Sequence, residues 1–501
     1  MSQGAYVLAI DQGTTSTRSI LFDAKGRACA TAQLPLTQLY PAPGQVEHDP
    51  EEIWRSVLQV GRAVLREVGA RSVVAIGITN QRETTVVWER ATGKPLANAI
   101  VWQDRRTADL CAELVQEGWG AHVAEVTGLV IDPYFSATKL AWLLTNVPGL
   151  DARARAGEVC FGTIDSFLLF KLTSGRLHAT DATNAARTML FDIRSGQWDE
   201  RLLDRLAIPR TVLPELRNSQ SDYGVTEHAH FGTAIPIRGI AGDQQAAAYG
   251  QACFAPGMLK ATYGTGCFVL ANTGEEKVAS ATRMLSTIFH QLEGRRAYAL
   301  EGAIFMAGAT VQWLRDSLGL VSSAAESEAL AREADPKARV YLVPAFQGLG
   351  APLWDANARG AILGLTRAAS KADIVAAGLE AVAFQTRDLL TAMGRDTAAS
   401  GIPAPPSLRV DGGMTGNAWL MQRLADILGQ RVEVALNPET TALGAAYHAG
   451  QAVGFFGSAD ELAKTWAPAS AFEPKMSEAE REARYGGWLD AVARVRTEGA
   501  N

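Results

Sequence analysis

The segment from Asp11 to Arg18, which reads DQGTTSTR, has residues suited to binding a phosphate group and a divalent cation. Gly13 lacks a Cβ, so the backbone there can approach an anion closely. Arg18 adds a guanidinium group, whose fork of donors matches phosphate oxygens. Asp11 follows an apolar run and can hold a hydrated Mg²⁺, which proteins usually bind through one or two carboxylates. Hydroxyl and amide donors come from three consecutive residues, Thr14, Thr15 and Ser16. Taken alone, the segment also fits an ordinary polar hairpin tip.

Two later segments contain similar turns. The sequence YGTGC at 263–267 places Thr265 between two glycines, and the sequence VDGGMTGN at 410–417 closes an apolar run. Glycines at such turns would let an adenine or a ribose lie against the backbone. We therefore expect all three turns to contribute to one nucleotide site.

Charged and polar residues in the sequences TNQRETT (79–85) and GIAGDQQA (239–246) form a second group. Arg82 and Glu83 are adjacent, and Asp243 stands before two glutamines. A carboxylate can take a proton from an alcohol when it lies within hydrogen-bond reach of the hydroxyl. The alternatives are a surface salt bridge for Arg82 and Glu83, and a helix cap for Asp243, which is compatible with catalysis.

A strand hairpin must position the first of these segments. Residues 6–10 form a short, apolar, β-rich run, and further extended runs follow at 19–22 and 27–32. A hairpin differs from P-loops and dinucleotide-binding turns, which lie between a strand and a helix. Neither a G-x-x-x-x-G-K-[ST] nor a G-x-G-x-x-G pattern occurs in the sequence.

A helix is predicted from Pro50, with Asp49 as its N-cap and Glu52 placed to complete a capping box. Its buried face is marked by apolar residues three and four positions apart: Ile53, Val57, Val60 and Val64. A strand is predicted at 73–79, and residues 109–206 are expected to be mainly helical.

The second half of the sequence repeats this plan. Residues 257–263 and 267–271 are predicted strands around the turn at 264–266. One face of a long helix is marked by Val375, Leu379, Val382, Leu389 and Met393. We expect two α/β domains, residues 1–251 and 252–501, that arose by duplication and face each other across a cleft. Chance similarity of two hairpins is the alternative.

The overall composition is that of a globular protein. Of the 501 residues, 47% are apolar and 20% are charged, which argues against disorder. The net charge of −6 provides no basic field for nucleic acid. The sequence contains no apolar run of about 18 residues, the length that a membrane-spanning helix needs. Five cysteines without a C-x-x-C spacing predict neither a disulfide framework nor a zinc site. We therefore expect a cytoplasmic protein.

The order of the motifs resembles a known group of proteins. A DxGTTS hairpin, a GTG turn and a DGG turn are similar to the motifs of the actin-like ATPases, which include sugar kinases, actins and heat-shock chaperones. Within that group, YFSATKLAWLL at 134–144 resembles the first signature of the FGGY carbohydrate kinases, which include glycerol, xylulose and gluconate kinases. The likeness runs from about residue 6 to about residue 487. It implies two actin-like (ribonuclease H-like) α/β domains.

The substrate segments resemble those of the glycerol-phosphorylating members of the family. This implies ATP-dependent phosphorylation of glycerol to sn-glycerol 3-phosphate, with Asp243 as the general base for the attacking hydroxyl. Arg82 can donate two hydrogen bonds and Glu83 can accept two, which suits a pair of neighbouring hydroxyls. Further contacts implied by the resemblance are Tyr134 and Gln244, with Trp102 and Phe268 along the carbon edge of the substrate.

The resemblance also implies ATP and Mg²⁺ as cofactors, with Asp11 near the metal, and a homo-oligomer, either a dimer or a tetramer. The implied nucleotide contacts are Thr14, Thr15, Ser16, Arg18, Thr265, Gly308, Gln312, Gly413 and Asn417. Two alternatives stay open. The protein could phosphorylate another polyol or ketose, of the xylulose or gluconate type, or it could be an actin-like or chaperone-like ATPase.

Overall fold

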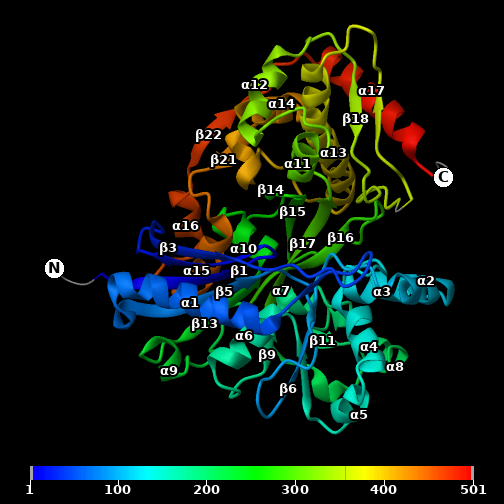
Figure 1. Cartoon of the computed structure of the whole chain (residues 1–501). Helices are drawn as coiled ribbons and strands as arrows, with labels where there is room; N and C mark the ends of the chain where they lie inside the picture. Colours follow the sequence, from blue (N-terminus) through cyan, green and yellow to red (C-terminus); the bar gives the residue numbers. More distant parts are fainter. Residues whose placement is uncertain (1–3, 356, 498–501) are drawn as a thin grey trace. The chain divides into compact units, whose positions relative to one another are not determined.

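The computed structural model describes residues 4–355 and 357–497 of the chain. These residues form two compact units that alternate along the sequence, as the colours of Figure 1 allow the reader to follow. Unit 1 contains Met1–Ala252, Ser286–Ala299 and Glu439–Thr465. Unit 2 contains Cys253–Leu285, Leu300–Pro438 and Trp466–Asn501.

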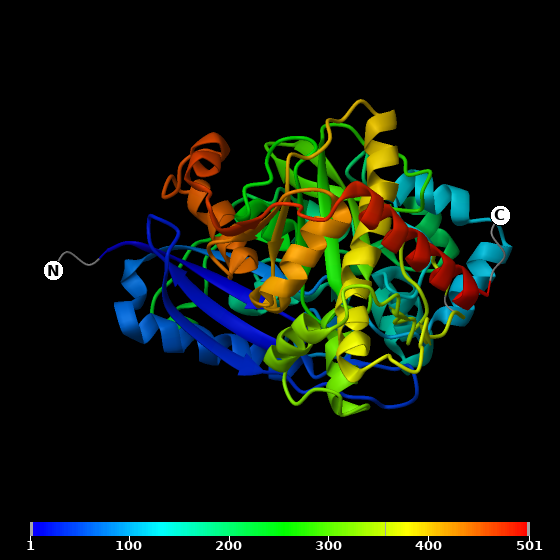
Figure 2. The same cartoon turned by 90° about the horizontal axis from the view of Figure 1, so that it is seen from above.

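The core of unit 1 is a five-stranded sheet with the order β13-β5-β1-β2-β3. Its strands are β1 (Tyr6–Gln12), β2 (Ser16–Phe22), β3 (Ala28–Pro35), β5 (Val73–Asn80) and β13 (Ile237–Gly242). β1 pairs antiparallel with β2, while β5 pairs parallel with both β1 and β13. The first three strands of the chain lie side by side in the view of Figure 2. Because β1, β5 and β13 are parallel, their carboxyl ends meet at one edge of the sheet.

Helices cover both faces of this sheet. On one face, α1 (Pro50–Val68) and α6 (Ile164–Leu172) share an apolar core with Ile76 and Ile78 of β5, and Figure 1 shows α1 along the strands β1 and β3. Side chains alternate along a strand, so Gly77 faces the other side. There, a Cβ at Gly77 would overlap the backbone of α15 (Thr440–Gln451).

The helix α15 also lies very close to α10 (Asp243–Gly250). A Cβ added at Gly444 would overlap the carbonyl of Ala246, and one added at Gly250 would overlap the carbonyl of Thr440. Only glycine permits this backbone-to-backbone approach, which fixes α10, and with it the position of Asp243, on the sheet.

The other elements of unit 1 surround this core. They are β4 (Glu47–His48), β6 (Val86–Glu89), β7 (Ala99–Ile100), α2 (Ala108–Gln116), α3 (Gly120–Thr127), α4 (Ser136–Asn146), α5 (Leu150–Arg155), β8 (Val159–Gly162), β9 (Ala179–Asp181), α7 (Ala182–Ala185), β10 (Phe191–Asp192), β11 (Gln197–Trp198), α8 (Glu200–Arg205), β12 (Glu215–Arg217), α9 (His228–Phe231) and α16 (Ala459–Thr465).

The second large sheet has the order β16-β17-β15-β14-β20-β21-β22. Its strands are β14 (Leu259–Tyr263), β15 (Cys267–Gly274), β16 (Leu285–Leu292), β17 (Arg295–Ile304), β20 (Leu408–Asp411), β21 (Val432–Ala435) and β22 (Pro468–Phe472). β14 and β15 are antiparallel with Tyr263 opposite Cys267, so residues 264–266 form the turn. β14 is parallel to β20, and therefore the end of β20 lies beside this turn.

The helices of unit 2 are α11 (Gly308–Asp316), α12 (Ala324–Glu333), α13 (Lys371–Ala399), α14 (Ala418–Leu428) and α17 (Glu478–Val495), and β18 (Tyr341–Val343) pairs with β19 (Ala361–Leu363). The apolar face predicted for α13 is buried at all five positions. Of the helices in the described part of the chain, none is long and apolar enough to cross a membrane.

The predicted start of α1 is correct in one detail and wrong in another. Asp49 caps the helix by accepting a hydrogen bond from the Glu51 amide (2.9 Å), and Pro50 is its first residue. Glu52 does not close a capping box, because its Oε1 accepts the amide of Thr37 instead (3.0 Å). This tertiary contact lies outside the local pattern on which the expectation depended.

Candidate active site

The turn between β1 and β2 is held in place by its own backbone and by two glutamines. The Gly13 amide donates to the Ser16 carbonyl (2.9 Å), and the side chains of Gln12 and Gln81 donate to the Gly13 carbonyl (2.6 and 3.2 Å). β1 extends to Gln12 and β2 starts at Ser16, so the tip is shorter than the sequence suggested. Thr14 is half-buried and Thr15 is exposed, which leaves both available to a ligand.

Asp11 and Arg18 lie together at the end of this hairpin. The Arg18 guanidinium contacts Asp11 Oδ2 (3.2 Å) and Glu439 Oε2 (2.7 Å). Burial raises the pKa of Asp11, while Arg18 lowers it and Glu439 raises it again. Two carboxylates thus share one guanidinium, and a divalent cation arriving with phosphates would stabilise the charged form of Asp11. The residues therefore fit the expected Mg²⁺.

This fit needs no preformed metal cage. Within residues 4–355 and 357–497, no group of three or more His, Cys, Asp or Glu side chains is placed to hold a metal ion. Mg²⁺ commonly keeps several waters and binds through one or two carboxylates together with substrate phosphates. Glu439 was not foreseen from the sequence, because it lies 421 residues from Arg18 and belongs to no motif.

Arg82, Glu83 and Asp243 meet where β5 and β13 end. Arg82 Nε lies 3.1 Å from Asp243 Oδ1 and 3.8 Å from Glu83 Oε1. Arg82 and Glu83 are almost fully buried, whereas the Asp243 side chain is 28% exposed. A surface salt bridge is therefore the wrong interpretation of Arg82 and Glu83. Asp243 is the member of the group with the most exposed side chain.

Glu83 has a strained backbone that its neighbours hold in place. Its φ of 62° lies in the left-handed region, which costs a non-glycine residue about 1–3 kcal/mol and is typical of functional sites. Arg187 Nε donates to Glu83 Oε1 (2.6 Å), and Ser136 Oγ donates to the Glu83 carbonyl (2.9 Å). Arg187 is completely buried. The sequence around it contained no signal that could have identified it.

Aromatic rings form a wall in the same unit. Trp102 and Tyr134 meet edge to face, with centroids 5.7 Å apart, and the Arg187 guanidinium lies 5.5 Å from the Tyr134 ring. Trp102 Nε1 also donates to Thr14 Oγ1 (2.9 Å). The wall is therefore linked directly to the turn between β1 and β2.

Lys139 is hydrogen-bonded to the backbone around Tyr134, one of the two wall residues. It lies in the first turn of α4, where the helix dipole disfavours a cation, and it is fully buried. Its Nζ donates to the carbonyls of Pro133 (2.6 Å), Tyr134 (2.6 Å) and Phe135 (3.2 Å). Burial lowers its pKa to about 8. Lys139 was part of the recognised YFSATK segment, but its role could not be predicted from sequence.

The predicted nucleotide turns of unit 2 also come together. The Gly308 amide, at the start of α11, donates to the Gly264 carbonyl (3.0 Å), and the Thr265 carbonyl accepts the amides of Ala307 and Ala309. Gly412 has a φ of 94°, and a Cβ there would overlap the Tyr263 carbonyl. Thr265, Gly308 and the DGG turn thus share one edge of the sheet.

The remaining predicted contacts have clear places in the fold. Gln312 is exposed on α11, and Asn417 caps α14 by accepting the Leu420 amide (2.9 Å). Gln244, the residue after Asp243 on α10, is buried. Phe268 lies on β15, in unit 2, whereas the other expected glycerol contacts lie in unit 1.

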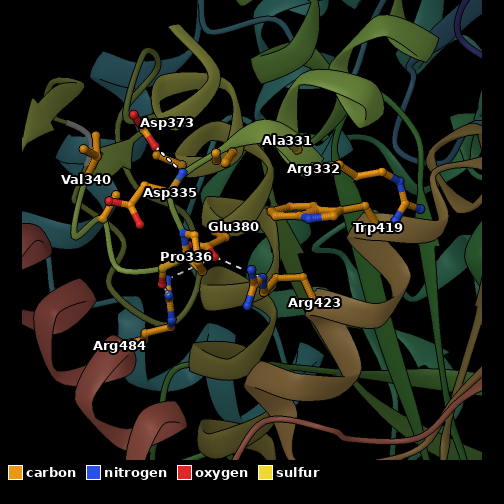
Figure 3. A pocket seen from close by; sticks show the side chains of 14 residues that line it. Ala331, Arg332, Asp335, Pro336, Val340, Asp373, Glu380, Trp419, Arg423 and Arg484 are labelled. Atoms are coloured by element: carbon orange, nitrogen blue, oxygen red, sulfur yellow. Dashed lines mark hydrogen bonds and ion pairs between the residues drawn. The ribbon is translucent and has the colours of Figure 1, made fainter. Parts of the chain in front are cut away.

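A separate cavity of about 190 Å³ in unit 2 contains none of the predicted site residues. Figure 3 shows that Arg423 and Arg484 point toward Glu380. Arg423 Nε lies 3.0 Å from Glu380 Oε1, and the Arg423 guanidinium lies 4.9 Å from the Trp419 ring. Glu380 thus pairs with both Arg423 and Arg484, an arrangement that is typical of a structural network.

Comparison with known proteins identifies the family. Residues 6–250 match the N-terminal domain of the FGGY family of carbohydrate kinases, and residues 259–453 match its C-terminal domain. The chain belongs to this family. The expected resemblance and the α/β fold of the actin-like sugar kinases are confirmed.

Three relatives illustrate how close the similarity is. Glycerol kinase of Alcanivorax borkumensis is 57% identical over 492 residues, which cover 98% of each chain. The structure of Plasmodium falciparum glycerol kinase with ADP has a TM-score of 0.92 at 37% identity and covers 99% of each chain. A ligand-bound xylulose kinase from Lactobacillus acidophilus has a TM-score of 0.87 at 22% identity, with 98% of each chain covered, which shows the shared fold alone.

Proposed function

We propose that this FGGY kinase transfers the γ-phosphoryl group of ATP to glycerol and forms sn-glycerol 3-phosphate. The observation that carries the proposal is the contact between buried Arg82 and partly exposed Asp243, 3.1 Å apart, beside the buried carboxylate of Glu83. The 57% identity to a glycerol kinase over almost the whole chain supports glycerol as the substrate.

The donors and acceptors of this group suit a small triol. Arg82 donates and Glu83 accepts, so one dipeptide can satisfy two neighbouring hydroxyls. Tyr134 and Gln244 would add single contacts, and Trp102 would face the carbon edge of the substrate. Phe268 stays a predicted second wall residue. A site of this kind discriminates strongly against analogues that lack a hydroxyl, because a buried polar group would then be left unpaired.

Asp243 would act as the general base. Its carboxylate is accessible, and its position at the first residue of α10 is fixed by the close packing of α10 on α15. It accepts the Gln244 amide at one oxygen (2.7 Å), and it would take the proton of the terminal hydroxyl as that oxygen attacks the γ-phosphorus.

The nucleotide contacts stay those predicted from the sequence. Thr14, Thr15, Ser16 and Arg18 would bind its phosphates, and the contacts predicted for the rest of the molecule are Thr265, Gly308, Gln312, Gly413 and Asn417. Asp11 would hold Mg²⁺, which offsets charge on the transferred group. The division into domains 1–251 and 252–501, a homo-oligomeric state and a cytoplasmic location belong to the same proposal.

The decisive experiment is the substitution Asp243→Asn. We expect kcat with glycerol to fall by about 10²–10⁴, the usual contribution of a general base, while the affinity for ATP measured by calorimetry stays unchanged. Asp151→Asn is the matched control, because Asp151 is a half-buried aspartate of unit 1 that pairs with Arg155. Unchanged turnover in Asp243→Asn would contradict the assignment.

A substrate panel tests the two alternatives. Phosphorylation of glycerol, xylulose and gluconate should be measured with the wild-type protein at equal concentrations. Phosphorylation of xylulose or gluconate, but not of glycerol, would favour a kinase of another polyol or ketose. ATP turnover that does not depend on any polyol, and that survives Asp243→Asn, would favour an actin-like or chaperone-like ATPase.

A further inference from the structure

One hydrogen bond connects the aromatic wall with the phosphate turn. Trp102 Nε1 lies 2.9 Å from Thr14 Oγ1, although the two residues are 88 positions apart in the sequence. An indole nitrogen can only donate, whereas a hydroxyl can donate once and accept twice. The direction of this bond is therefore fixed: Trp102 donates and Thr14 accepts.

The fixed direction determines what the Thr14 hydroxyl can do next. With one lone pair engaged by Trp102, the hydroxyl proton must point elsewhere, and the described residues offer it no acceptor. Two neighbouring groups of the turn have other partners: the Gly13 amide donates to the Ser16 carbonyl (2.9 Å), and Ser16 Oγ accepts the Gln33 side chain (2.8 Å). The Trp102 N–H therefore constrains the direction in which the Thr14 hydroxyl can donate its own hydrogen bond.

Trp102 is itself held by the substrate segment. Its backbone amide lies 3.3 Å from Thr84 Oγ1, directly after Glu83, and its ring meets Tyr134 edge to face. Movement of the wall therefore changes the orientation of the indole N–H. One side chain touches both the surface expected to contact the polyol and the hydroxyl expected to contact the phosphate.

We propose that Trp102 is a positioning residue for phosphoryl transfer: its ring lines the polyol site, while its N–H orients the Thr14 hydroxyl as a donor to the phosphate of the nucleotide. This inference rests on the proposed function. It goes beyond a wall role for Trp102, because it assigns the residue an effect on nucleotide binding and transfer that is exerted through Thr14.

A double-mutant cycle with Trp102→Phe and Thr14→Val tests the proposal. Each single variant should weaken binding of a non-hydrolysable ATP analogue, measured by calorimetry without glycerol, by about three- to tenfold, the usual effect of one lost hydrogen bond. In the Thr14→Val background, Trp102→Phe should weaken it no further. Thr14→Ser, which keeps the hydroxyl, should bind the analogue as the wild type does.

Additive effects in the cycle would overturn the proposal, and so would a Trp102→Phe variant that changes only KM for glycerol. Trp142→Phe is the matched control, since Trp142 is a half-buried tryptophan of the same unit whose ring faces Arg106. Analogue binding requires no turnover. A wild-type protein that fails to phosphorylate glycerol would therefore refute the proposed function while the cycle still tests the Trp102–Thr14 coupling.

Discussion

Raising the pH above 8 should weaken glycerol binding through Lys139. The protonated ammonium satisfies three carbonyls, those of Pro133, Tyr134 and Phe135, but a neutral amine has only two N–H groups. With a pKa of about 8, about nine-tenths of the lysine is neutral at pH 9. The peptide that carries Tyr134 then loses a charge-assisted set of hydrogen bonds, each worth about 1.5–3 kcal/mol. We expect KM for glycerol to rise about tenfold between pH 7 and pH 9.

The same titration should affect stability in the opposite direction. The pKa of Lys139 is lowered from 10.5 to about 8 in the folded state, so the folded protein releases this proton before the unfolded chain does. Between pH 8 and pH 10.5 the unfolded state binds more protons, and the contribution of Lys139 to the free energy of unfolding therefore rises with pH. The full gain is about 3 kcal/mol. The distinguishing result is a higher KM for glycerol above pH 8 without a lower contribution of Lys139 to the free energy of unfolding.

Steady-state kinetics and urea unfolding between pH 7 and pH 9.5 check both parts. Lys139→Arg keeps its charge throughout this range, so its KM for glycerol should not show the rise above pH 8. Lys139→Met should have a raised KM at every pH. Lys171→Met, which removes a lysine paired with Glu51 in the same unit (2.8 Å), is the control. If wild type and Lys139→Arg have the same pH profile, the reasoning is wrong.

Three further predictions follow from buried groups. Arg187→Met leaves the Glu83 carboxylate buried without its 2.6 Å partner, so we expect a loss of about 3–5 kcal/mol of stability and a raised KM for glycerol, measured by urea unfolding and kinetics. Gly444→Ala should lower Tm, because its Cβ overlaps the Ala246 carbonyl, whereas Gly394→Ala in α13 has open space and should stabilise the helix by about 0.5–1 kcal/mol. Burial lowers the pKa of three histidines to about 4: His48, His178 and His290. Because the unfolded chain binds their protons near pH 6.5, stability should fall as the pH drops from 6.5 to 4, by on the order of 2 kcal/mol for each at pH 5; an unfolding free energy that stays flat over this range would contradict this.

Local features of the site were predictable from sequence, because neighbouring residues determine them. The hairpin around Gly13 follows from two apolar runs separated by a polar turn, and the position of Asp243 follows from a strand that ends in glycine before a helix. The apolar face of α13 follows from helical spacing. In each case the signal and the structure lie within the same few dozen residues.

The supporting residues were not predictable, because their partners are distant in the sequence. Glu439 reaches Arg18 only because α15 returns from late in the chain to pack in unit 1. Gly444 allows α15 to pack closely on α10, but the residues of α15 alone do not identify the helix and strands that it contacts. Arg187 and Lys139 are buried cations, and the sequence alone would have favoured exposed positions for both.

Buried hydrogen bonds fix the directions of the polar groups in the proposed glycerol site. Arg82 is oriented by Gln245 (3.0 Å), and Gln245 is in turn anchored to the Ile288 carbonyl (3.0 Å), while Arg187 orients Glu83. The donors and acceptors that a triol would meet are thus bonded to protein groups on their far side, and their directions are set by the fold. Polar groups that need not reorganise during reaction stabilise a transition state most effectively. A substrate whose hydroxyls are arranged differently would not match these fixed donors and acceptors, so we expect the buried supports to influence which alcohol is phosphorylated.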